Sequence, residues 1–341
     1  MKKNKPHRIV PDDERPELDF LGRVFCPFKE SFAAAWREWG ENYNKIHTEK
    51  PRIAVQSTMK DDVLNDISTI KDMTKFPSIN TEGGYEEFFK ADFLNAGEKL
   101  ALFKTLPPPD KINPVFDGLR LRDPKGIFTI YGAMPYVLLV NHKRLHGRTV
   151  PRRISDLTKP EYAASVGAVY AINDITELLL LEIWKEQGEA GIRALARNIS
   201  FGGREAAVSE DAVSDIPAGS GAAVYVLSWL AANSVPKRDC LEVIWPDDGA
   251  IFCPLYAIAK KETEAAQIER QKACADFLFS AGLGAAMAEK YLVHINADVK
   301  HKTPPAARFR WVGWDYIYET PVEERVKTIE DIFNDEKKKT A

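Results

Sequence analysis

Long apolar runs, a strong excess of charge and metal-type cysteine spacings are all missing from this chain of 341 residues. No segment approaches the ~18 apolar residues that a transmembrane helix needs, so we expect no membrane span. The net charge of -3 gives no electrostatic reason to expect a nucleic-acid partner. Four cysteines, Cys26, Cys240, Cys253 and Cys274, form no CxxC motif. We therefore expect reduced, mostly buried thiols, no metal site and no cofactor.

We expect no secretion signal in the sequence as written. The chain begins MKKNKPH, which is basic, but polar and acidic residues follow in place of the ~7–15-residue apolar stretch of a signal peptide. The sequence as written favours a cytoplasmic location. The alternative is a periplasmic or cell-surface location, if an export signal has been removed. Residues 1–16 are charged and contain proline, and we predict a loosely attached arm there.

The chain has the composition of a globular protein, with 45% apolar and 28% charged residues, and its length suits two domains. The run Phe128 to Asn141, FTIYGAMPYVLLVN, is interrupted by Pro135. Because proline cannot donate to a central ladder, we predict that one strand ends there and another begins in a second domain. The run Ile251 to Lys260 is interrupted by Pro254 in the same way, which predicts the return crossing.

Strands and helices alternate on both sides of the first crossing. Before it, we predict strands at 18–25, 52–57 and 76–80, with helices opening at Cys26-Pro27 and covering 61–73 and 85–103. After it, we predict strands at 166–172, 222–228 and 241–245, with helices at 175–188, 189–198, 204–215 and 229–235 among them. Three more helices, at 265–281, 284–293 and 320–339, follow the return crossing. This succession predicts an α/β protein in which each domain has a mostly parallel sheet flanked by helices.

Several segments then occur in a recognisable order. FTIYGAMPYVLLVNHKRL is followed by PRRISDLTKPEYAASVGAV, IWPDDGAIFCPLYAIAKK, ACADFLFSAGLGAAMAEK and the Trp-Asp of VGWDYIYE. In this order they resemble the solute-binding receptors of ABC uptake systems, in the class that contains the ferric-iron-binding proteins. The resemblance covers residues 17–335. It implies a type II periplasmic-binding-protein fold, in which two lobes close around one small ligand.

The resemblance also implies an organisation and partners. Lobe 1 would contain 17–132 and 252–295, and lobe 2 would contain 133–251 and 296–341 with the C-terminal helix. The expected partners are a small-molecule or ion ligand and an ABC permease, and the chain is expected to be a monomer without catalytic activity. Iron-binding members carry two adjacent tyrosines, whereas this chain reads Tyr225-Val226-Leu227-Ser228-Trp229. The ligand could thus be an oxyanion, a phosphorylated or carboxylated metabolite, or a metal such as iron.

Candidate ligand contacts follow from the rule that ligands lie beyond the carboxyl ends of strands, beside helix N-termini. This rule selects the loops at 26–29, 57–59, 81–84 and 173–176, which follow predicted strands. Gly203 and Arg204, in a predicted glycine loop at 201–204, are added for close backbone approach and anion binding. Tyr256 is added because it follows the return crossing and could face the cleft. Capping or simple surface roles compete with ligand contact at each of them. The candidates are Cys26, Lys29, Ser57, Thr58, Thr81, Glu82, Asn173, Asp174, Gly203, Arg204 and Tyr256.

Two alternatives to a transport receptor remain. A cytosolic ligand sensor or buffer on the same fold would agree with the missing signal. An enzyme that uses Cys26 as a nucleophile is a further alternative, because a thiol at a helix N-terminus has a lowered pKa. No histidine accompanies Cys26 in a recognisable arrangement.

Overall fold

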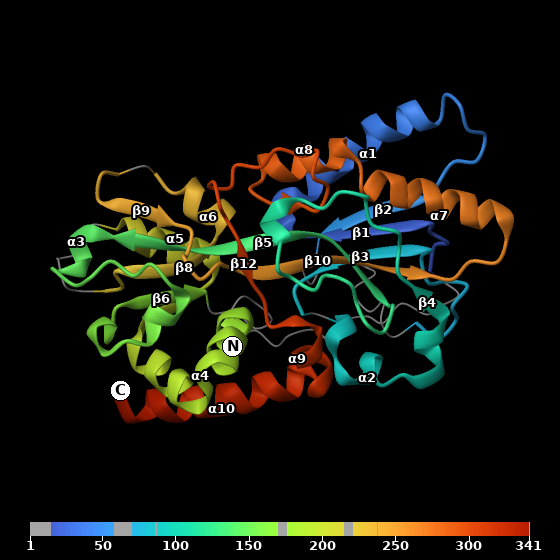
Figure 1. The fold of residues 1–341 in the computed structure, drawn as a ribbon. Helices are drawn as coiled ribbons and strands as arrows, with labels where there is room; N and C mark the ends of the chain where they lie inside the picture. The colour runs from blue at the N-terminus through green and yellow to red at the C-terminus, as the bar shows by residue number, and fades with distance from the viewer. Residues whose placement is uncertain are drawn as a thin grey trace. The chain divides into compact units, whose positions relative to one another are not determined.

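The structure is a computed structural model, and it describes residues 15–57, 70–85, 87–169, 176–214, 221–236 and 238–340. The chain forms two compact units (Figure 1). Unit 1 comprises Met1–Asn113, Leu121–Gly132 and Pro254–Lys300, and unit 2 comprises Pro114–Arg120, Ala133–Cys253 and His301–Ala341.

The elements follow one another in an α/β order. In unit 1, or beginning there, are β1 (Phe20–Val24), η2 (Cys26–Phe28), α1 (Lys29–Tyr43), β2 (Ile53–Ser57), β3 (Ile79–Gly83), η4 (Glu87–Phe89), α2 (Ala91–Leu94), η5 (Gly97–Leu102), β4 (Phe103–Lys104), β5 (Phe128–Asn141), α7 (Ala265–Leu278), α8 (Ala281–Glu289) and β11 (Val293–His294). In unit 2, or beginning there, are η6 (Pro114–Phe116), α3 (His142–Leu145), η7 (Ile154–Thr158), η8 (Pro160–Tyr162), β6 (Val166–Val169), α4 (Thr176–Asn198), β7 (Ile199–Gly203), α5 (Glu205–Val213), β8 (Val224–Ser228), α6 (Trp229–Ser234), β9 (Leu241–Ile244), β10 (Ala250–Lys260), β12 (Phe309–Arg310), α9 (Gly313–Glu319) and α10 (Val322–Thr340).

The sheet of unit 1 has β1 between β2 and β3, with all three strands parallel, and β10 runs antiparallel to β3. Alternate side chains of β1 point to opposite faces of this sheet. On one face, Phe20 stacks on Phe32 of α1 and meets Phe277 of α7 edge-on. The opposite face carries Tyr256 of β10, which the ring of Phe89 from η4 contacts. Figure 1 shows α1, α7 and α8 on one side of these strands and α2 on the other.

A buried carboxylate connects neighbouring elements at the amino end of this sheet. Asp19, which is 1% exposed, accepts hydrogen bonds from the backbone N–H of Arg52 at 2.7 Å and from the Nε of Arg270 at 3.0 Å. These bonds connect the residues just before β1 and β2 with α7. Although burial acts to raise the pKa of Asp19, the hydrogen bonds from Arg52 and Arg270 outweigh it, and the pKa is lowered. Asp19 therefore stabilises the sheet as a carboxylate.

The sheet of unit 2 has β6 between β7 and β8, again all parallel, with β5 antiparallel to β8. Helix α4 contacts β6 and β7, and α10 runs along α4 (Figure 1). Arg193 of α4 connects these helices through ion pairs with Asp335 and Glu336 of α10, each at 3.2 Å. Gly188 has φ of 62° and divides α4 into two helical stretches, as the sequence predicts.

The prediction that proline interrupts the two crossing runs is wrong. Both β5 and β10 are continuous strands. The chain crosses from unit 1 to unit 2 within β5 and returns to unit 1 within β10. The registers of β5 with β8 and β9 begin only at Tyr136 and Leu138, after Pro135. Strand β10 pairs with β12 at Ala250 and Ile251 and with β3 from Leu255 onward, on either side of Pro254. Each proline thus lies outside these ladders, and its missing N–H removes none of their bonds.

Three local predictions also differ from the structure. The helix predicted over 85–103 is three short segments, because Lys90 is extended and Gly97 has φ of 56°. The predicted loop at 81–84 belongs mostly to β3, which begins three residues later than expected and pairs with β10 as far as Gly83. The predicted glycine loop at 201–204 is mostly β7, whose Gly202 pairs with Ala168 of β6.

Other predictions are confirmed within the described residues. Strands β1, β2, β8 and β9 and helices α1, α5, α7, α8 and α10 lie where the sequence indicates. Arg15, at the end of the predicted loose arm, is buried at 4% exposure, so the arm prediction is wrong there. Residues 1–14, most of the helix predicted at 61–73 and residues 170–172 of a predicted strand lie outside the described part.

The four cysteines differ in their exposure. All four cysteines are free; Cys253 and Cys274 are buried, Cys240 is half-buried and Cys26 is exposed. No helix in the part of the chain that the structure describes has the length and apolar character needed to cross a membrane.

Candidate functional site

The carboxyl ends of the parallel strands of unit 1 lie at one edge of its sheet. Val24 ends β1 and pairs with Ser57, which ends β2, while β3 ends at Gly83. Each of these strands carries a polar side chain one residue before its end: Arg23, Gln56 and Glu82. The carboxyl ends of parallel strands are where α/β proteins place their ligands.

These side chains form a polar row across four strands. Gln56 pairs in register with Arg23, and Glu82 pairs with Tyr256 of β10. Gly22 of β1 pairs with Thr81 of β3, so the next residues, Arg23 and Glu82, are also neighbours. The Nη1 atom of Arg23 lies 2.5 Å from the Oε1 atom of Glu82. We call Gln56, Arg23, Glu82 and Tyr256 the polar row. Arg23 is 4% exposed, and Glu82 and Tyr256 are fully buried.

Buried charges of this kind are costly without compensation. The effective penalty for taking an ion out of water is several kcal/mol, which a close ion pair offsets only with good geometry. The pair of Arg23 and Glu82 is therefore a weak source of net stability. A buried ion pair between Arg23 and Glu82 at the strand ends suits a role in fixing the positions of the polar side chains there.

Two neighbouring amides have unused hydrogen-bonding atoms. Asn80 lies two residues before Glu82 on the same face of β3 and is fully buried. Among the described residues, neither amide atom of Asn80 has a hydrogen-bond partner, and the same holds for Oε1 of Gln56. A buried polar atom without a partner costs about 1–3 kcal/mol, so such atoms are rare unless they serve a purpose.

An aromatic wall bounds one end of the polar row. The rings of Phe89 and Phe128 are stacked 4.7 Å apart and both meet Tyr256 edge-on, at 5.1 and 5.3 Å. These apolar contacts hold the Tyr256 ring in place. The row therefore runs from a half-buried amide, Gln56, to an aromatic ring fixed in the core.

The structure brings together only some of the residues that the sequence selects in unit 1. Glu82 and Tyr256 are adjacent in the polar row. Thr81 lies on the opposite face of β3, where its hydroxyl donates to the carbonyl of Arg23 at 3.4 Å. Cys26 is exposed at the start of η2, and Lys29 is half-buried at the start of α1.

Of the two candidates Ser57 and Thr58, the structure describes only Ser57. Ser57 is the last residue of β2 and is half-buried, beside the carboxyl ends of the other strands. Thr58 lies outside the described residues.

Unit 2 has a corresponding edge at the ends of β7 and β8. Gly203 ends β7, and the exposed Arg204 precedes the first residue of α5. The next residue, Glu205, accepts the backbone N–H of Ser228, the last residue of β8, through Oε1 at 2.9 Å. The two strand ends are thus connected by a carboxylate, next to an exposed guanidinium. Asn173 and Asp174 lie outside the described residues.

Tyr225, near the place of the adjacent tyrosines of iron-binding proteins, points into the interior of unit 2. Its hydroxyl donates to Oδ2 of Asp211 at 2.6 Å and accepts from the buried guanidinium of Arg144. Burial raises the pKa of Tyr225, and the hydrogen bond to Asp211 raises it further. Its ring also covers Gly167, where a Cβ would lie 2.5 Å from Cδ1 of Tyr225. Tyr225 is therefore held in the core as a neutral phenol.

In ranges 15–57, 70–85, 87–169, 176–214, 221–236 and 238–340, no three His, Cys, Asp or Glu side chains come close enough to hold a metal ion.

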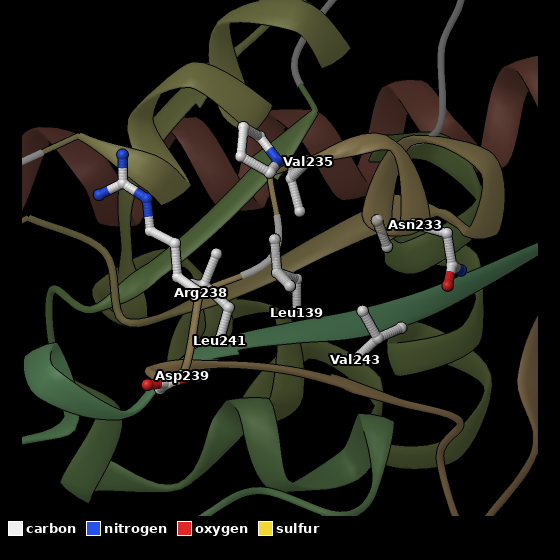
Figure 2. Close-up of a pocket in the computed structure, with 9 residues that line it drawn as sticks. Leu139, Asn233, Val235, Arg238, Asp239, Leu241 and Val243 are labelled. Carbon is white, nitrogen blue, oxygen red and sulfur yellow. The ribbon is translucent and has the colours of Figure 1, made fainter.

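A pocket of about 350 Å³ lies elsewhere in unit 2. Figure 2 shows Leu139, Leu241 and Val235 gathered at its centre, with Arg238 and Asp239 to one side and Asn233 to the other. It is lined by the far end of α6 and the residues that follow, not by the strand ends at Gly203 and Ser228. Arg238 and Asp239 give its rim charges of both signs.

Sequence reasoning missed Arg23, Gln56 and Asn80. Arg23 and Gln56 are polar residues in short strands, FLGRV and IAVQS, whose other residues are largely apolar. That exception was the available signal. Asn80 lies in INTEG, which has no such contrast. The rule that ligands lie in the loops beyond the strands does not select residues inside a strand.

Comparisons with known proteins agree with this architecture. The family model described as "Bacterial extracellular solute-binding protein" matches residues 74–320. No curated protein matches the chain in sequence. Among solved structures, the ferric binding protein from Campylobacter jejuni is 13% identical with a TM-score of 0.62, and the match covers 93% of this chain and 99% of that one.

Two further solved structures have the same fold. The periplasmic binding protein AfuA from Actinobacillus pleuropneumoniae, with exogenous fructose-6-phosphate bound, is 15% identical with a TM-score of 0.59, over 94% of this chain and 98% of that one. The Trichodesmium protein IdiA (FutA), in complex with iron and citrate, is 11% identical with a TM-score of 0.64, over 92% and 98%. At these identities the likeness shows the fold alone.

The fold predicted from the sequence, that of the periplasmic binding proteins, is thus confirmed. The expectation of a cytoplasmic location has no support from a family of extracellular proteins. Because the family model matches well over half of its length, this chain belongs to the bacterial extracellular solute-binding proteins.

Proposed function

We propose that this protein is the receptor of an ABC uptake system for a small phosphorylated or carboxylated solute, which it delivers to a membrane permease. The observation that carries the proposal is the family match over residues 74–320. The proposal includes no catalytic step. It places the mature protein outside the cytoplasm, where a receptor of this family meets its solute.

The charges at the strand ends support an anionic ligand. Lys29 begins α1 in unit 1, and Arg204 precedes α5 in unit 2. Neither side chain forms an ion pair with another described residue. The carboxylates nearby are engaged, because Glu82 pairs with Arg23 and Glu205 accepts the N–H of Ser228. Each cation lies at a helix end whose unpaired N–H groups also favour an anion.

Two of the similar solved structures contain phosphorylated or carboxylated compounds: fructose-6-phosphate in AfuA, and citrate with iron in the Trichodesmium protein. The burial of Tyr225 in this chain removes one hard oxygen ligand from consideration for ferric iron. We therefore favour the organic anion over the bare metal ion as the ligand.

The test is a thermal-shift screen of the purified protein. The panel contains sugar phosphates, di- and tricarboxylates, inorganic phosphate and sulfate, and ferric iron with and without citrate. A ligand present at 100 times its dissociation constant adds about 2.7 kcal/mol to the free energy of unfolding, which raises the melting temperature clearly. The proposal expects at least one organic anion to do so without iron.

Two variants with matched controls locate the site. Arg204→Gln and Lys29→Gln should each weaken binding of that anion roughly tenfold or more, since charge-assisted hydrogen bonds contribute about 1.5–3 kcal/mol. Arg153→Gln in unit 2 and Arg37→Gln in unit 1 remove exposed arginines away from the strand ends and should leave binding unchanged. A response to ferric iron alone would refute the choice of ligand, and equal effects of variants and controls would refute the choice of site.

A further inference from the structure

Unit 1 contains a second hollow, separate from the polar row, of about 470 Å³. Small-molecule sites in proteins have volumes of about 300–1,000 Å³ and are mostly apolar with few polar groups. This hollow has such a lining: Leu106, Pro107, Pro108, Ile112, Phe128 and Ile130 contribute apolar surface. We call it the proline-walled pocket.

Hydrogen bonds hold the first wall of the pocket in place. The residues after β4 include Pro107 and Pro108, which cannot donate to a strand ladder. The backbone N–H of Leu106 instead donates to Oγ1 of Thr129 at 2.8 Å. This bond fixes the start of the wall against β5.

The second wall is a turn built around Asp123. Its carboxylate accepts the backbone N–H groups of Lys125, Ile127 and Phe128 at 2.9, 2.7 and 2.9 Å. The charge of Asp123 is therefore compensated by the turn, and the side chain is 2% exposed. It presents little negative charge to the pocket.

The third wall contains Ile112, and backbone pairing holds this segment against residues 295 and 296. Ile112 forms an isolated bridge with Asn296, and the N–H of Asn113 donates to the carbonyl of Ile295 at 2.8 Å. Ile112 remains 41% exposed despite these bonds. Because hydrogen bonds fix three sides of the pocket, we infer that its shape is preformed. Its lining is mostly apolar.

The lining of the proline-walled pocket also includes a cationic side chain, that of Arg122. Arg122 lines the pocket and is exposed, and it forms no ion pair or side-chain hydrogen bond with any described residue. A guanidinium binds carboxylate, sulfonate or phosphate groups through paired hydrogen bonds. An apolar hollow with one cation and a compensated carboxylate is complementary to a molecule with an apolar body and one anionic group.

We propose that the proline-walled pocket is a second ligand site, for a small amphipathic anion. The apolar body contacts Leu106, Phe128 and Ile130, and the anionic group pairs with Arg122. This inference is independent of the proposed function, because none of the strand-end residues lines the pocket. The ligand could be an aromatic or aliphatic carboxylate or a related sulfonate, which share this chemistry.

The test uses two dyes that differ only in charge. The anionic dye 8-anilinonaphthalene-1-sulfonate and the neutral N-phenyl-1-naphthylamine share their rings and differ by the sulfonate. Fluorescence titration of the full chain should show the anionic dye binding at one saturable site roughly tenfold more tightly than the neutral dye. Arg122→Gln should abolish that preference, and Arg37→Gln should keep it.

A filling variant tests the location. Ile112→Trp places a large ring at the mouth of the pocket and should weaken binding of both dyes at least tenfold. Ile268→Trp is the matched control, because Ile268 is similarly exposed, at 44%, on α7 of the same unit. Far-UV circular dichroism and the melting temperature establish that each variant folds.

Each outcome decides the inference. Equal binding by the two dyes, or a preference that survives Arg122→Gln, overturns the role of Arg122. Unchanged binding in Ile112→Trp, or no saturable binding in the wild type, overturns the site itself. The melting-temperature response to the organic anion of the transport proposal should be the same in both pocket variants, so failure of one proposal leaves the other standing.

Discussion

Arg23 and Glu82 lie side by side on neighbouring parallel strands, with Nη1 and Oε1 separated by 2.5 Å and both side chains buried. They stand one residue before the carboxyl ends of β1 and β3. The amino end of the same sheet is held by Asp19, Arg52 and Arg270. The sheet thus has charged groups at both ends, and only the carboxyl end is where α/β proteins bind ligands.

The first prediction concerns removal of one partner from this pair. Arg23→Met leaves the carboxylate of Glu82 buried without the guanidinium, so the free energy of unfolding should fall by about 3–5 kcal/mol. Urea unfolding followed by circular dichroism measures it. The double variant Arg23→Met/Glu82→Leu should recover most of the loss, because apolar side chains of similar size replace a buried ion pair at little cost. A loss below about 1 kcal/mol in the single variant would contradict this account of the pair.

The second prediction concerns pH. The pKa of Asp19 is lowered in the folded protein, since the hydrogen bonds from Arg52 and Arg270 outweigh burial. A carboxyl group with a lowered folded pKa stabilises the protein above its unfolded pKa of about 3.9. That stability is lost as the pH falls through the folded pKa. Asp19→Asn should therefore lower the free energy of unfolding most above about pH 5.

Denaturant unfolding of wild type and Asp19→Asn at a series of pH values between 2 and 7 measures this difference. The two stabilities should converge as the pH falls below the folded pKa of Asp19. A difference that stays constant over the whole range would mean that the charge of Asp19 contributes nothing, and that only its shape and neutral hydrogen bonds matter.

The third prediction concerns Gly132, in the crossing strand β5. A Cβ there would lie 2.6 Å from Cε of Met287 and 2.6 Å from the backbone carbonyl of Val293. Since the backbone of β11 cannot move freely, Gly132→Ala should destabilise the protein by about 1–3 kcal/mol. Gly40→Ala is the control, because its Cβ would meet no atom closer than 3.8 Å and alanine favours the helix α1. Thermal unfolding should move in opposite directions for these two variants.

The sequence predicts the alternating elements well, because the apolar patterns of β1, α1 and α7 depend on local spacing. It fails where partner strands decide the outcome. Pro135 and Pro254 lie in continuous strands, and the registers of β5 with β8 and of β10 with β3 begin only after them. No local rule reveals where such a register begins. The glycines at 202 and 203 form a strand because β6 pairs with them.

The candidate site was predicted only in part, for a related reason. Glu82 and Tyr256 were selected from the sequence, but their contact depends on the antiparallel register of β3 with β10. Arg23 and Gln56 join them through the parallel registers of β1 with its neighbours. A register between strands far apart in sequence cannot be read from one sequence, so a row of side chains across four strands remains hidden until the structure is known.

The central claim, that this chain binds one small organic anion as a transport receptor, is tested most directly by isothermal titration calorimetry with the anion that the thermal-shift screen identifies. We predict one ligand per chain, with binding weakened roughly tenfold by Arg204→Gln and unchanged by Arg153→Gln. Titrations that show no saturable heat with any phosphorylated or carboxylated solute, while ferric iron alone binds one to one, would contradict the account.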